Sequence, residues 1–164
     1  MILVASDREP SATEAERALS RHGHTVFRAH TPRIALEAAR SAQPDVVLVD
    51  RHLAQTDPLA LCRSLRDDPE VGPSTPILMI TGDRPNLAEH RAAIRAGVWE
   101  FLVEPYHPDE LTGRVDAYVL ALMDLRKTAA GPLTDATGLY TTDGLARRAR
   151  ELAMQAFHHH AGMA

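Results

Sequence analysis

Cysteine and long hydrophobic runs are scarce in this chain of 164 residues. Its one cysteine, Cys62, cannot form an internal disulfide, which indicates a reducing compartment. Cys62 lies in an apolar helical pattern, so we interpret it as a core residue rather than a nucleophile. No run approaches the ~20 apolar residues of a membrane span, and no basic segment precedes the short apolar start. These absences predict a soluble, cytoplasmic protein without a membrane partner.

Positive charge is also limited. The formal net charge is −4, and the arginines are scattered along helical stretches instead of forming one run. A nucleic-acid partner is therefore not expected. The length is sufficient for one well-packed domain with an appendage.

Five apolar runs recur along the first two thirds of the chain. Four of them are continuous, as expected for strands that are buried on both faces. The second is short and flanked by polar residues, which predicts a more exposed strand. The runs are Ile2 to Ala5, Val26 to Phe27, Val46 to Val49, Ile77 to Ile80 and Phe101 to Val103.

Helical patterns with readable ends separate these runs. Thr31 followed by Pro32 is typical of a helix start, and Gly23 and Gly97 are typical helix terminators. The alternation of strand and helix predicts a parallel sheet with helices on both faces. The expected helices cover Pro10 to Arg21, Pro32 to about Ser41, Pro58 to about Asp67, Asn86 to Ala96, and a fifth that starts near Pro108.

Polar residues follow four of the five runs. In a parallel α/β sheet the functional site lies beyond the carboxyl ends of the strands, where the strand order reverses. Three acids and a threonine at these ends therefore predict a shared polar pocket. The residues are Ser6 and Asp7, then Asp50, Thr81 and Glu104.

The stretches "ILVASDREP", "PDVVLVDRHL", "PILMITG" and "AGVWEFLVEPYHPDEL", in this order and spacing, resemble the receiver domain of two-component response regulators. The resemblance covers about residues 1 to 125. It implies a flavodoxin-like, doubly wound (βα)5 fold with a five-stranded parallel sheet. It also implies that Asp50 accepts a phosphoryl group, that Thr81 contacts this group, and that Thr81 and Phe101 act as switch residues.

The sequence departs from the family pattern at several of these places. The family holds Mg²⁺ with a pair of acids after the first strand, where this chain has Ser6 and Asp7. It ends the fifth strand with a lysine before a proline, where this chain has Glu104. The loop after Asp50 differs too, since Ala54 and Pro58 stand near positions of a family proline and glycine.

Glu104 leaves several interpretations open. Two like charges about 4 Å apart cost of order 4 kcal/mol at an effective dielectric near 20. In one interpretation Asp7, Asp50 and Glu104 therefore bind Mg²⁺ or Ca²⁺ together, and phosphorylation is poor. In another, Glu104 turns to solvent or pairs with Arg84 or His52, and phosphorylated Asp50 is short-lived. In the last, the site has degenerated and carries out no chemistry.

One competing resemblance starts at the same aspartate. Asp50, Arg51 and His52 begin like the Asp-x-His-x-x-Gly motif of cobalamin-binding domains. Position 55 is Gln55 and not glycine, and that motif normally follows the first strand. We therefore expect no bound cofactor other than Mg²⁺.

The resulting prediction is a signalling domain rather than an enzyme. The resemblance implies a receiver domain with impaired phosphorylation at Asp50 and a sensor histidine kinase or phosphotransfer protein as partner. The alternative is a pseudo-receiver that acts as an interaction or dimerisation module without phosphorylation. Dimerisation is expected through the face formed by the fourth helix, fifth strand and fifth helix, or through an extended fifth helix.

The last forty residues are expected to lie outside the receiver domain. Gly131 and Pro132 predict a linker over residues 126–138, and residues 139–164 read as a helical tail. The stretch from Thr137 to Tyr140 resembles the start of a GGDEF, or diguanylate-cyclase-like, domain, but the GGDEF signature is absent. Three adjacent histidines, 158 to 160, are interpreted as a solvated helix end.

Overall fold

The computed structural model describes residues 1–54, 56–71 and 74–129. Strands and helices alternate along the chain, as the apolar runs predict. The strands are β1 (Ile2–Ala5), β2 (Val26–Ala29), β3 (Val46–Asp50), β4 (Ile77–Thr81) and β5 (Glu100–Val103). The helices are α1 (Glu9–Arg21), α2 (Pro32–Ala42), α3 (Pro58–Asp67), α4 (Leu87–Arg95) and α5 (Pro108–Ala129).

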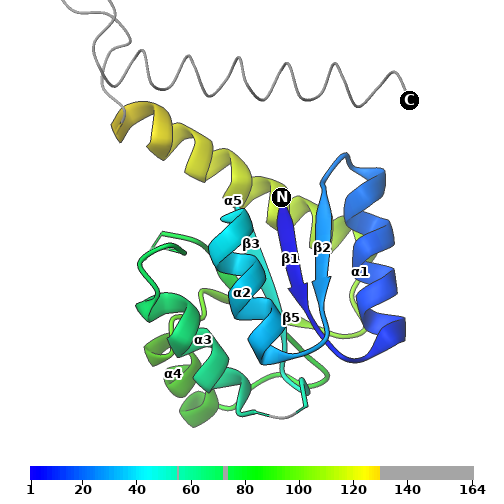
Figure 1. Cartoon of the computed structure of the whole chain (residues 1–164). Helices are drawn as coiled ribbons and strands as arrows, with labels where there is room; N and C mark the ends of the chain where they lie inside the picture. The colour runs from blue at the N-terminus through cyan, green and yellow to red at the C-terminus, as the bar shows by residue number, and fades with distance from the viewer. Residues whose placement is uncertain (55, 72–73, 130–164) are drawn as a thin grey trace, which may run out of the picture. The chain divides into compact units, whose positions relative to one another are not determined.

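All five strands are parallel and form one sheet in the order β2-β1-β3-β4-β5 (Figure 1). The registers place Ala5 beside Val49, and Asp50 beside Ile80, so the strands end along a common edge. The strand order reverses between β1 and β3, and sites of parallel α/β sheets lie at this place on the carboxyl edge. The predicted doubly wound, flavodoxin-like (βα)5 fold is confirmed.

The helices cover the sheet on two faces (Figure 1). One hydrophobic cluster joins the sheet to α1 and α5, and includes Leu19, Leu111 and Val115. The other joins it to α2, α3 and α4, and includes Leu65 and Ala93. Burial on both faces explains why the central strands read as continuous apolar runs.

Local signals explain where the helices begin and end. The Thr31 hydroxyl accepts a hydrogen bond from the amide of Ile34 at the start of α2. Asn86 and Glu89 form a reciprocal capping box at the start of α4. Gly97, after the end of α4, has a φ of +91°, which favours glycine. The observed bounds differ from the expected ones by one or two residues.

Two expectations about burial are also confirmed. β2 lies at the edge of the sheet, and the side chain of Phe27 in its middle is exposed. Cys62 is fully buried in the core, and burial raises the pKa of its thiol to about 12. A thiol with that pKa stays protonated near neutral pH, which fits a core residue and not a nucleophile.

The fifth helix is long, with 22 residues, and those up to Leu120 belong to the same compact unit as the sheet. No helix within the described residues is long and apolar enough to cross a membrane. The expected linker, the GGDEF-like stretch and the histidines 158 to 160 lie at or beyond the end of the described residues. The predicted domain bounds of 1–125, 126–138 and 139–164 therefore stay predictions.

Candidate functional site

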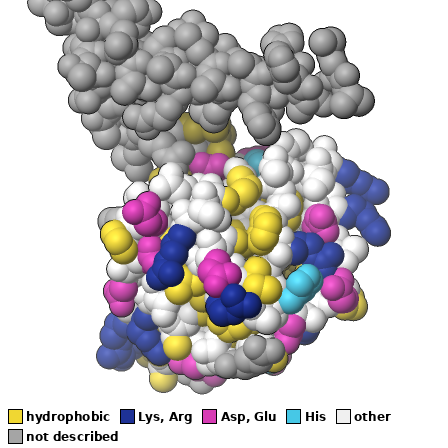
Figure 2. Space-filling model, viewed as in Figure 1, with side chains coloured by type: hydrophobic (Ala, Val, Ile, Leu, Met, Phe, Trp, Pro, Cys, Tyr) yellow, Lys and Arg dark blue, Asp and Glu magenta, His cyan; other side chains and the backbone are white. Residues whose placement is uncertain are grey.

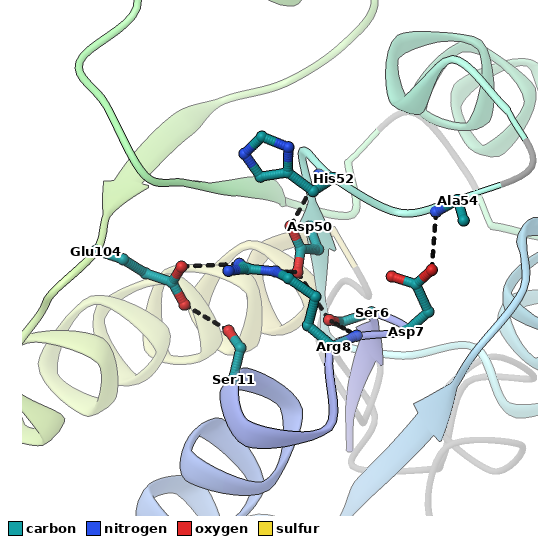
Figure 3. Close-up of polar contacts among 8 residues, drawn as sticks. All are labelled: Ser6, Asp7, Arg8, Ser11, Asp50, His52, Ala54 and Glu104. Carbon is teal, nitrogen blue, oxygen red and sulfur yellow. Dashed lines mark hydrogen bonds and ion pairs between the residues drawn. The ribbon is translucent and has the colours of Figure 1, made fainter.

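The candidate site lies at the carboxyl edge of the sheet, where the strand order reverses between β1 and β3 (Figure 3). Asp50 is the last residue of β3, and its side chain is fully buried. A buried carboxylate is costly unless hydrogen bonds and a counter-charge compensate it. The contacts of Asp50 are therefore the centre of the site.

Three donors surround the Asp50 carboxylate. The Ser6 hydroxyl and the Arg8 Nε–H both donate to Oδ2, each at 2.7 Å. The backbone amide of His52 donates to Oδ1 at 2.9 Å. Since an ionised carboxylate offers about four lone-pair positions, most of its capacity to accept is already used.

Ser6 also fixes the position of Arg8. Its oxygen accepts a hydrogen bond from the Arg8 amide at 3.1 Å while its hydroxyl donates to Asp50. Arg8 is the N-cap residue of α1 and has extended backbone angles. The short turn from β1 into α1 thus aims the guanidinium across the edge of the sheet.

Glu104 follows β5, and its amide extends the ladder by donating to the Thr81 carbonyl at 2.7 Å. Two residues near the start of α1 bind its carboxylate. Arg8 Nη2 donates to Oε2 at 2.7 Å, and the buried Ser11 hydroxyl donates to Oε1. Glu104 therefore points toward α1 and Asp50 (Figure 3).

Arg8 connects two strands that are not neighbours. β4 lies between β3 and β5, so their backbones are about 10 Å apart at ordinary strand spacing. The side chains of Asp50 and Glu104 both reach toward Arg8, and different nitrogens of its guanidinium bind the two carboxylates. Its hydrogen bonds and charge interactions with Asp50 and Glu104 raise the pKa of Arg8 above its ordinary value, against an opposing effect of burial.

Asp7 takes no part in this arrangement. Its side chain is exposed and accepts a hydrogen bond from the Ala54 amide at 3.1 Å, on the loop after β3. In Figure 3 its carboxylate points away from Arg8. The structure therefore brings Asp50 and Glu104 together through Arg8 but leaves Asp7 directed elsewhere.

Comparison with known proteins identifies the family. The family model described as "Response regulator receiver domain" matches residues 2–116. The chain belongs to the response regulator receiver family. The response regulator MprA of Mycobacterium ulcerans is 35% identical over 116 residues, which cover 71% of this chain and 48% of that protein. The chain thus spans about half the length of the curated relatives it matches.

Solved structures agree with this assignment. The receiver domain of NtrX from Brucella abortus is 28% identical, has a TM-score of 0.65, and covers 73% of this chain and 98% of that one. The chemotaxis protein CheY4 of Vibrio cholerae, at 23% identity and a TM-score of 0.67, covers 71% of this chain and 96% of that one and supports the fold alone.

Receiver domains generally bind Mg²⁺ for phosphorylation, and whether this site fits that ion depends on the groups that already contact Asp50. The Asp50 oxygens already accept three hydrogen bonds, and Arg8 lies between Asp50 and Glu104. A divalent ion about 4 Å from a guanidinium is repelled by roughly 8 kcal/mol at an effective dielectric near 20. No group of three or more acidic, histidine or cysteine side chains suited to a metal occurs in the described part of the chain. This arrangement does not fit Mg²⁺, and the Asp7, Asp50 and Glu104 metal site stays a prediction.

The two predicted switch residues lie on β4 and β5. Thr81 is buried, and its hydroxyl donates to the Asp83 carbonyl at 3.0 Å. Phe101 is half-buried, with its ring centroid 5.5 Å from that of His90 on α4. Phe101 also lines a cavity of about 220 Å³, together with Leu59, Met79 and the ion pair of Arg51 with Glu89. Their switch roles stay predictions.

The sequence interpretation missed Arg8 and Ser11. It named Arg84 and His52 as candidate partners of Glu104, but the base in the structure is Arg8. A signal was available in the sequence. An acid in place of the family lysine calls for a base from a neighbouring loop, and Arg8 directly follows Ser6 and Asp7 after the first strand.

Proposed function

We propose that this chain is a receiver module of two-component signal transduction in which phosphoryl transfer to Asp50 is impaired. Its expected partner is a sensor histidine kinase or a phosphotransfer protein. The observation that carries the proposal is the Arg8 guanidinium, which binds both Asp50 and Glu104 at the carboxyl edge of the sheet. Family membership supports the signalling role, and the altered contacts support the impairment.

The impairment follows from the charges at the site. Asp50 must attack a phosphorus centre that is already anionic, so cations are needed to neutralise the developing charge. Glu104 stands where the family lysine is expected and binds the only guanidinium that contacts Asp50 among the described residues. The Arg8 Nε–H also occupies Oδ2 of Asp50 and lowers the nucleophilicity of that oxygen.

A second candidate is a pseudo-receiver that acts by protein interaction alone. The contacts of the Asp50 and Glu104 carboxylates favour this candidate. Ser6, Arg8 and Ser11 together compensate both carboxylates without any further ligand. In this case the domain keeps the receiver fold and its contact surface but never accepts a phosphoryl group.

Intact mass spectrometry after incubation with acetyl phosphate and MgCl₂ separates the two candidates. We expect the wild type to gain one phosphoryl group slowly and Asp50→Asn to gain none. Ser6→Asp combined with Glu104→Lys restores two family groups and should raise the rate by about 100-fold or more, since one stabilising donor is worth roughly 10²–10³-fold. If the double variant gains mass and the wild type never does, the pseudo-receiver is correct. If neither gains mass, Asp50 is not a phosphoacceptor.

The proposed contact surface is the face of α4, β5 and α5. Leu87 and Ile94 on α4 have exposed side chains, and so has Trp99 just before β5. The Trp99 ring packs edge-on against Tyr118 of α5, with centroids 5.8 Å apart. The face in Figure 2 mixes hydrophobic, acidic and basic side chains. Exposed apolar side chains of this size support a protein contact.

Light scattering after size exclusion tests whether this surface makes a homodimer. We expect a concentration-dependent dimer that Ile94→Asp shifts to monomer. Phe27→Asp on β2 is the matched control, since Phe27 is also exposed but lies at the opposite edge of the sheet. Equal effects of the two changes would argue against this surface.

A further inference from the structure

The contacts of Arg8 resemble those that a bound cation would make. A cation at this edge of the sheet has to contact the Asp50 carboxylate and counter a second acid across β4. Arg8 meets both requirements with Nε on Asp50 and Nη2 on Glu104, each at 2.7 Å. Guanidinium suits this role because its donors lie in one rigid plane and its charge persists at any ordinary pH.

The backbone and neighbouring side chains hold Arg8 in this place. The Arg8 amide donates to Ser6 Oγ, so the residue is anchored before its side chain starts. Ser11, three residues further on, binds the same glutamate that Arg8 binds. Two residues near the start of α1 therefore act on one carboxylate, which keeps Glu104 within reach of the guanidinium.

The charges around Asp50 are consistent with this role. Without Arg8, Glu104 would leave Asp50 facing a second negative charge with no base among the described residues in contact with either acid. Arg8 supplies that base from a different strand end, so the cation comes from the β1–α1 turn and not from the end of β5. Arg8 and Glu104 therefore form one ion pair beside Asp50, and the role of each depends on the other.

We propose that Arg8 is a built-in counter-ion that takes the place of a divalent cation at Asp50, so that the resting site neither needs nor binds one. This inference rests on the proposed function, since it concerns the same carboxylate. It goes further by making the resting state of the site independent of metal and by assigning that property to one side chain. Arg8 is a positioning residue here, since no substrate contact is assigned to it.

The test is a titration of the purified protein with Mn²⁺, followed by the electron paramagnetic resonance signal of the free ion. The wild type should show no binding in the range where Arg8→Ala binds, and Arg8→Ala should bind at least tenfold more tightly. Glu104→Gln added to Arg8→Ala should weaken binding again. Arg28→Ala is the matched control, because Arg28 also binds two carboxylates, those of Glu9 and Glu16. It should behave as the wild type.

Thermal unfolding adds a second readout. Mn²⁺ should raise the Tm of Arg8→Ala but not that of the wild type, because an ion that binds only the folded state stabilises it. If Arg8→Ala does not fold without metal, Arg8→Gln keeps a polar side chain with hydrogen-bond donors but no charge, and is measured instead. Wild-type binding as tight as that of Arg8→Ala, or Arg8→Ala binding no tighter than Arg28→Ala, would overturn the inference.

Failure of this inference is distinct from failure of the proposed function. The Mn²⁺ titration involves no phosphoryl donor, and the acetyl phosphate assay reads Asp50 directly. A wild type that binds Mn²⁺ and is phosphorylated would remove the counter-ion role and leave the receiver function in place. A wild type that binds no metal and is never phosphorylated would leave the counter-ion role in place and remove phosphorylation at Asp50.

Discussion

Three arginines among the described residues each bind two carboxylates, and two of them, Arg8 and Arg28, differ in the burial of those acids. Arg8 binds Asp50 and Glu104, whose side chains are 0% and 21% exposed. The guanidinium itself is not deeply buried, since the Arg8 side chain is 37% exposed. The burial of its partners is what makes this cluster sensitive to the loss of the arginine, because a buried charge needs a compensating one.

The second cluster also joins one arginine to two acids, but here the acids are exposed. Arg28 on β2 binds Glu9 and Glu16, whose side chains are 67% and 42% exposed. Water can solvate both acids when the arginine is absent. The Arg28 Nε is buried with no hydrogen-bond partner among the described residues, which further limits what this arginine contributes. The comparison teaches that the environment of the acids, and not the number of ion pairs, sets the importance of an arginine.

The largest expected difference is in stability. Arg8→Ala should lower the free energy of unfolding by about 2–3 kcal/mol in the presence of EDTA, because it leaves two carboxylates without their base. Arg28→Ala should lower it by less than about 1 kcal/mol. Urea unfolding followed by circular dichroism measures both. Equal losses would show that burial of the acids does not matter here.

A double-mutant cycle sharpens the same comparison at the level of one pair. The cycle of Arg8→Ala with Asp50→Asn should give a coupling free energy of about 1–2 kcal/mol, since both partners touch in a buried site. The cycle of Arg28→Ala with Glu9→Gln should give a clearly smaller coupling free energy, because Glu9 is exposed to water. Urea unfolding of the four single and two double variants supplies the values. A larger coupling at Arg28 would reverse our interpretation.

Ser11 offers a smaller test of how Glu104 is held. Ser11→Ala removes one hydrogen bond to Glu104 in a buried place and should cost about 1 kcal/mol of stability. Ser20 lies on the same helix but is exposed, and Ser20→Ala should change stability by no more than about 0.5 kcal/mol. Chemical unfolding of the two variants side by side is the measurement. No difference between them would mean that Ser11 does not position Glu104.

The smallest expected effect concerns pH at the exposed cluster. The hydrogen bond from Arg28 lowers the pKa of Glu9 below its ordinary 4.5. A lowered pKa in the folded state stabilises the protein above the ordinary value, and this contribution is lost as the pH falls through the folded pKa. The small Tm difference between wild type and Arg28→Ala near pH 7 should therefore shrink as the pH falls below the ordinary pKa of Glu9 and vanish once Glu9 is protonated in the folded state. A difference that grows in acid would contradict the assignment.

The fold could be predicted from the sequence because its signals are local. The continuous apolar runs, the cap at Thr31 and the terminator at Gly97 each report on a few adjacent residues. Asp50 could be placed at a strand end for the same reason. These signals also explain why the element bounds differ by only one or two residues.

The contacts of Glu104 could not be predicted in the same way. Arg8 and Glu104 are 96 residues apart, and which loop base reaches an acid depends on how the strand ends and α1 are arranged in space. The substitution of lysine by glutamate indicated a missing cation, but several loops carry a base. In the structure, the Arg8 amide is held by a hydrogen bond to Ser6 Oγ in the turn after β1. This anchoring explains why Arg8 is the base that reaches both carboxylates.

The central claim is that the Arg8 guanidinium is the cation at Asp50. A crystal structure of the wild-type chain grown at high MgCl₂ tests it most directly. Our account predicts Arg8 between Asp50 and Glu104, with no ion bound to either carboxylate. A magnesium ion on Asp50 with Arg8 turned out to solvent would contradict it.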